Sequence, residues 1–105
     1  MLLGLLFSCG QVDPINNDDP RDLTMEVSVA EDGSGLVSIQ ASAINATLYS
    51  LFIDSDKDPI AENTSGSFEY TFVQTGLYQV EVRAYGTSGK YLRESRQVSI
   101  SLGIG

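Results

Sequence analysis

Residues Gly66 to Tyr85 read GSFEYTFVQTGLYQVEVRAY and give the clearest indication of the fold. Apolar residues recur at every second position in both halves of this stretch. They are Phe68, Tyr70 and Phe72 in the first half and Tyr78, Val80, Val82 and Ala84 in the second. A period of two residues is typical of a β-strand with one buried face, and Gln74-Thr75-Gly76 predicts a turn between the halves. The stretch therefore predicts two strands joined by a tight turn.

The same alternation recurs outside this stretch. It is found near residues 23–29, 37–43, 49–53 and 98–102, and Ile60-Ala61 after Pro59 has the form of a short edge strand. Turn-forming residues separate these segments, and none of them shows the 3.6-residue period of a helix. The chain is therefore predicted to be all-β, an antiparallel β-sandwich of about seven strands. A domain of this size can bury an adequate core without disulfides.

Gly66–Phe72 and Thr75–Val82 resemble the second half of a PKD domain, an Ig-like module. Its members typically show aromatic-x-aromatic, a short turn and then Gly-x-Tyr-x-Val-x-Val. Asn45–Asp54 is similar to the preceding strand of that family, and the resemblance spans residues 23–102. The family's Trp-x-Phe-Gly-Asp-Gly motif is absent, and Leu51 stands at the tryptophan position. A generic Ig-like or fibronectin-like sandwich is therefore the competing interpretation.

Two residues of the Gly66–Tyr85 stretch have predicted structural roles. Gly76 is expected to allow a tight corner, because glycine accepts backbone conformations closed to other residues. Tyr78 stands where a tyrosine corner would tie the loop to the following strand through its hydroxyl.

The N-terminus reads MLLGLLFSCG and is predicted to be an export signal. Its apolar run of about eight residues is shorter than the ~20 that span a bilayer. Leu6–Gly10 resembles the bacterial lipoprotein box, which implies cleavage before Cys9 and acylation of that cysteine, and hence a membrane anchor. The expected organisation is a signal at residues 1–8, lipidated Cys9 with an acidic linker at residues 9–22, and the sandwich at residues 23–102. A buried N-terminal strand with a core cysteine is the competing interpretation.

The acidic run Asn16-Asn17-Asp18-Asp19 resembles export signals of surface lipoproteins in Bacteroidetes. That resemblance implies a surface-exposed protein of the outer membrane. The competing interpretation is that the same residues form a solvated linker that carries no export signal.

Composition excludes several classes of function. The 105 residues include 14 Asp and Glu against six Lys and Arg, which gives a net charge of −8, with no His and one Cys. Without histidine there is no Ser-His-Asp or Cys-His nucleophile, and one cysteine cannot form an internal disulfide or a thiolate zinc cage. The acidic balance argues against a nucleic-acid partner. No enzymatic activity is predicted.

Two groups of residues are candidate sites. Asp54, Asp56 and Asp58 alternate through a loop and could converge on Ca²⁺, which favours oxygen ligands. A solvated acidic loop is the competing interpretation. No other cofactor is expected. Tyr85 and Tyr91 flank the loop of residues 86–90, and Phe52 is expected on the outer face of its strand, so these aromatics could stack on sugar rings. Ordinary surface packing is the alternative for these aromatics.

These observations together predict a non-catalytic, lipid-anchored module of the cell envelope. Its predicted work is spacing, presentation or binding of a protein or carbohydrate. The alternative is an N-terminal accessory domain of a longer glycoside hydrolase, because PKD-like modules often accompany glycan-degrading enzymes.

Overall fold

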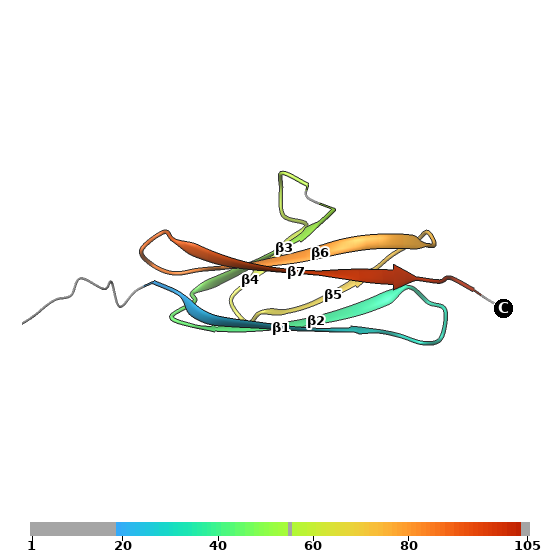
Figure 1. The fold of residues 1–105 in the computed structure, drawn as a ribbon, viewed down its shortest axis with the longest axis horizontal. Helices are drawn as coiled ribbons and strands as arrows, with labels where there is room; N and C mark the ends of the chain where they lie inside the picture. Colours follow the sequence, from blue (N-terminus) through green and yellow to red (C-terminus); the bar gives the residue numbers. More distant parts are fainter. Residues whose placement is uncertain (1–18, 55, 104–105) are drawn as a thin grey trace, which may run out of the picture.

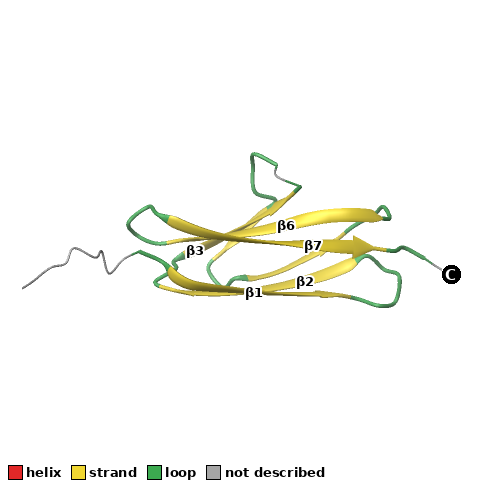
Figure 2. Ribbon diagram, viewed as in Figure 1, coloured by secondary structure: helices red, strands yellow, loops and turns green. Residues whose placement is uncertain are grey.

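The computed structural model describes residues 19–54 and 56–103, in which all regular secondary structure is β-strand (Figures 1 and 2). The seven strands are β1 (Arg21–Val29), β2 (Leu36–Ile44), β3 (Leu48–Ile53), β4 (Ala61–Asn63), β5 (Ser67–Thr71), β6 (Gly76–Tyr85) and β7 (Tyr91–Ile100). The signal segment at residues 1–8, the proposed lipidation site Cys9 and the linker as far as residue 18 lie outside the described residues.

The strands form two antiparallel sheets that face each other (Figure 1). One sheet has the order β1-β2-β5 and the other the order β4-β3-β6-β7. The chain crosses between the sheets after β2, after β4 and after β5, which gives an Ig-like sandwich. The predicted all-β, Ig-like antiparallel β-sandwich of about seven strands is confirmed.

The core lies between the inner faces of the two sheets. In β6, for example, Val80, Val82 and Ala84 are fully buried, and the residues between them point to the outside. The core residues are Met25, Val37, Ile39, Ala41, Tyr49, Leu51, Ile53, Phe68, Phe72, Val80, Val82, Ala84, Val98 and Ile100. Burial of these side chains is the main force that holds the two sheets together.

Tyr78 fastens the chain where it passes from β5 into β6. Its hydroxyl donates a hydrogen bond to the Gln74 carbonyl oxygen at 2.8 Å. Its ring stacks on Phe72 with a centroid distance of 4.1 Å and an interplanar angle of 27°. This contact ties the β5–β6 turn to the core in the manner of a tyrosine corner.

The predicted corner role of Gly76 is wrong. Gly76 begins β6 without a positive φ, and a Cβ there would lie 3.7 Å from the Tyr78 ring, an ordinary contact. The glycines that the fold requires are Gly35, with φ of 86°, and Gly66, with φ of 81°. A Cβ on Gly35 would overlap the Phe72 carbonyl oxygen, and one on Gly66 would overlap the Ala41 carbonyl oxygen.

β7 starts well before the expected strand at residues 98–102. Its first half carries Glu94 and Arg96 on the same face as the buried Val98 and Ile100, which hides the apolar alternation. Arg96 pairs with Glu94 at 2.7 Å and donates a hydrogen bond to the Met25 carbonyl oxygen of β1 at 3.3 Å. These charges stay partly solvated because β7 is the edge of its sheet, next to β1.

The two ends of the domain lie far apart (Figure 1). The chain enters β1 at one end of the sandwich and leaves β7 at the other. Beyond β7, the Leu102 amide donates to the Thr75 hydroxyl at 3.0 Å, and the Gly103 amide donates to the Gly33 carbonyl at 3.3 Å. The outgoing chain is therefore fixed to turns of both sheets.

Candidate functional site

The outer face of the four-stranded sheet gathers aromatic and arginine side chains. Across the β6–β7 ladder, Tyr85 lies opposite Tyr91 and Arg83 lies opposite Arg93. Across the β3–β6 ladder, Ser50 lies opposite Arg83 and Phe52 lies opposite Glu81. On β6, Val80, Val82 and Ala84 point into the core, so the residues between them point away from it. Their partners on β3 and β7 lie on the same outer side of the sheet. We call this surface the tyrosine–arginine face; it comprises Phe52, Glu81, Arg83, Tyr85, Tyr91 and Arg93.

The two tyrosines that the sequence singled out are brought together. The ring centroids of Tyr85 and Tyr91 are 5.1 Å apart, with an interplanar angle of 35°. Tyr91 is 44% exposed and belongs to the edge strand β7, so one side of its ring is open to a ligand. The Tyr85–Tyr91 pair spans the β6–β7 hairpin next to its turn.

Arg83 organises this face. Its guanidinium pairs with the Glu81 carboxylate at 2.6 Å and lies 4.2 Å from the centre of the Phe52 ring and 5.2 Å from that of Tyr91. Hydrogen bonds to Glu81 first and to Tyr85 second raise the pKa of Arg83, so the group remains charged. Each partly exposed cation–π contact contributes about 0.5–1 kcal/mol. Arg83 therefore contacts both the Phe52 ring and the Tyr91 ring.

Phe52 is not an exposed stacking ring, and that prediction is wrong. It lies on the outer side of β3, as expected, but is only 3% exposed. Arg83, on the neighbouring strand β6, lies over the Phe52 ring and shields it from solvent. Ser50, on the same side of β3, is likewise buried and donates a hydrogen bond to Glu62 at 2.8 Å. Phe52 therefore lies beneath Arg83 and offers no exposed ring face.

The aspartate loop has a structural role at the end of β3. The Asp54 carboxylate accepts a hydrogen bond from the backbone amide of Gln79 at 2.8 Å. The backbone of Asp54 itself turns the chain, with φ of 53°. Within residues 19–54 and 56–103, no three His, Cys, Asp or Glu side chains form a group that could hold a metal ion. Within these ranges Asp54, Asp56 and Asp58 therefore do not form a preformed group, and calcium binding stays a prediction; Asp54 serves to join the end of β3 to β6.

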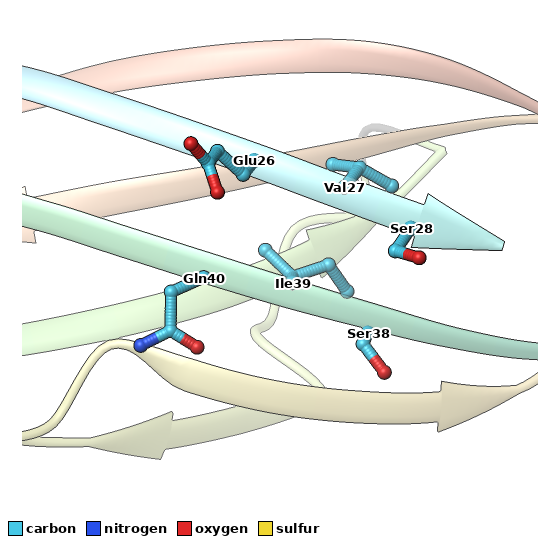
Figure 3. A pocket seen from close by; sticks show the side chains of 6 residues that line it. All are labelled: Glu26, Val27, Ser28, Ser38, Ile39 and Gln40. Carbon is cyan, nitrogen blue, oxygen red and sulfur yellow. The ribbon is translucent and has the colours of Figure 1, made fainter.

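Hollows also lie on the outer side of the other sheet. Two shallow depressions of about 460 and 560 Å³ follow the outer side of β2, where it meets β1 and β5. In Figure 3, Ser28, Ser38 and Gln40 project from the outer side while Ile39 projects from the other. Short serine side chains between longer ones create these hollows. They lack the enclosing apolar walls of a small-molecule site, so the tyrosine–arginine face is the stronger candidate.

Charge is distributed unevenly with respect to this face. Four of the six basic residues, but only two of the 14 acidic ones, lie between Gly76 and Ile100. The β6–β7 hairpin therefore carries +2 and the rest of the chain −10. Arg93 was not among the predicted site residues, because its position opposite Arg83 follows only from the strand register.

No helix long and apolar enough to cross a membrane occurs within the described ranges. Comparison of the chain with protein-family models, with curated proteins and with solved structures found no match.

Proposed function

We propose that this protein is a non-catalytic module of the cell envelope that binds carbohydrate through Tyr85 and Tyr91. The observation that carries the proposal is the pairing of these two rings on one outer sheet face, with Tyr91 open to solvent. The C–H face of a sugar ring is apolar and packs well on an aromatic ring. The PKD-like resemblance of residues 23–102 agrees with this role, because such modules commonly accompany glycan-degrading and adhesion proteins.

The rings are held in place before any ligand arrives. Arg83 contacts Tyr91 from one side, and Tyr85 packs beside Tyr91. A fixed ring loses little side-chain entropy on binding, so more of the contact energy becomes affinity. This preorganisation favours a binding role over simple surface packing.

The shape of the domain suits presentation. Because the chain enters and leaves at opposite ends (Figure 1), the domain adds its length as a spacer between whatever is joined to each end. The contacts of Leu102 and Gly103 with turns of both sheets give the outgoing chain a defined direction. Spacing and glycan binding are compatible, since the tyrosine–arginine face lies along the side of the sandwich.

A glycan array tests the binding proposal. We expect the protein to bind at least one class of oligosaccharide, and Tyr91→Ala or Tyr85→Ala to weaken that binding about tenfold, because an aromatic contact contributes about 1 kcal/mol or slightly more. Leu77→Ala is the matched control: Leu77 is 66% exposed on the same face of β6 but lies at its far end. An array without any bound glycan, or equal losses in the Leu77 variant, would contradict the proposal.

Lipid anchoring through Cys9 belongs to the same proposal, with surface exposure at the outer membrane. We expect Cys9→Ala to abolish incorporation of labelled fatty acid and to move the protein out of the membrane fraction, because no acyl chain can then be attached. Ser8→Ala keeps a small residue before the cysteine and should leave both readouts unchanged. Membrane fractionation that survives Cys9→Ala would rule the anchor out.

A further inference from the structure

Among the residues that the structure describes, Arg93 has no carboxylate partner, and it lies on the same face of β7 as the exposed Tyr91. Lys90 pairs with Asp19 at 3.5 Å, Arg83 with Glu81 and Arg96 with Glu94. Of the four cations of the β6–β7 hairpin, Arg93 alone makes no ion pair with any residue that the structure describes. Its side chain is exposed, so its hydrogen-bond donors are accessible from solvent.

The position of Arg93 is unfavourable in the free protein. It lies directly opposite Arg83 across the β6–β7 ladder, and like charges at such positions repel each other. Glu81 neutralises Arg83 but leaves the charge of Arg93 uncompensated. A bound anion beside Arg93 would relieve this repulsion.

We infer that the ligand of the tyrosine–arginine face is an acidic saccharide, with a sugar ring on Tyr91 and its carboxylate on Arg93. This inference rests on the proposed carbohydrate binding. Tyr91 and Arg93 are two residues apart on one strand, so both point to the same side and their Cα atoms are about 7 Å apart. A uronic acid carries its carboxylate directly on the sugar ring, which suits a stacking group and a cation at that spacing. The guanidinium fork matches a carboxylate with two parallel hydrogen bonds.

The charge of the whole molecule directs an anion to this place. The hairpin carries +2 and the remainder of the chain −10, so a carboxylate is repelled elsewhere. On the opposite sheet, Glu26 and Glu69 occupy the outer face. The same repulsion limits the affinity for long polyanions, which makes short oligomers the better probes.

A saccharide fits this face better than a folded protein. Stable protein interfaces bury more than about 1,000 Å² around a largely apolar core. Here Phe52 is already covered, and two exposed large apolar residues on the outer side of the hairpin, Tyr91 and Leu77, lie at its opposite ends. One accessible ring beside one free cation is enough for a sugar acid.

The test is isothermal titration of the full chain with four probes. These are trimers of galacturonate and mannuronate and the neutral trimers of galactose and mannose. We expect at least one uronate trimer to bind about tenfold or more tightly than its neutral counterpart, because a charge-assisted bidentate contact is added. Arg93→Gln should abolish this preference, so that the uronate and neutral trimers bind the variant with equal affinity. Arg96→Gln, which alters net charge equally on the opposite face of β7, should preserve the preference.

The outcomes separate the two proposals. Equal binding of neutral and uronate trimers overturns the inference and leaves the carbohydrate proposal standing, whereas no binding of any trimer overturns both. An equal loss in Arg96→Gln would assign the preference to overall charge and overturn the role of Arg93. Hexaglutamate serves as a fifth probe: if it binds as tightly as the uronate and also requires Arg93, the ligand is an acidic peptide, not a saccharide.

Discussion

Gly35→Ala is expected to destabilise the sandwich by about 3 kcal/mol or more, a large part of the 5–15 kcal/mol that typically stabilises a domain. Gly35 has φ of 86°, where an L-residue costs about 1–2 kcal/mol. The added Cβ would also overlap the Phe72 carbonyl oxygen and lie 2.9 Å from the Leu102 side chain. To relieve this overlap the Phe72 backbone would have to move. That movement would strain the hydrogen bond that the Phe72 amide donates to the Gly35 carbonyl oxygen at 2.9 Å. Urea unfolding followed by far-UV circular dichroism measures the loss.

Gly89→Ala is the matched control for this prediction. Gly89 has φ of 90°, and a Cβ there would meet no atom within 4 Å. Its replacement therefore isolates the conformational cost, about 1–2 kcal/mol, from the steric one. If the two variants lose equal stability, the close approach between Gly35 and Phe72 is not a constraint on the fold.

Leu51→Ala is expected to cost about 2–5 kcal/mol, because it opens a cavity in the centre of the core. Leu51 is 1% exposed, and its strand lies between β4 and β6, where its pairing partners are Ala61 and Val82. Strand ladders on both sides limit how far the backbone can collapse into the space. The same urea titration detects the change as a lower midpoint with an unchanged slope.

The control for the core variant is Leu77→Ala. The same atoms are removed from a side chain that is 66% exposed, so the expected change is within about 0.5 kcal/mol. A Leu51 variant as stable as the Leu77 variant would mean that Leu51 is not packed between the two sheets.

The fold was predictable because most strands carry a clear two-residue period. Val80, Val82 and Ala84 alternate with polar residues, and all three are buried. The prediction failed where tertiary position overrides the pattern. The first half of β7 has no apolar alternation, since Glu94 and Arg96 sit at an open sheet edge, where water and the β1 backbone satisfy them.

The site was predictable only in part. Tyr85 and Tyr91 flank a short loop, so a hairpin brings them together whatever the rest of the fold is. The burial of Phe52 depends on Arg83, which is distant in sequence and becomes a neighbour only through the β3–β6 register. Arg93 was missed for the same reason, because its opposition to Arg83 is a property of the ladder.

The separation of the two chain ends has a mechanical consequence. β1 leads inward from one end and β7 leads outward at the other, and both run along the length of the sandwich (Figure 1). Tension applied between the ends therefore acts parallel to the strands, in shear. β1 is held by its ladder with β2 and β7 by its ladder with β6, so many hydrogen bonds share the load and none is peeled open singly. A domain loaded in this direction therefore resists tension between its two ends.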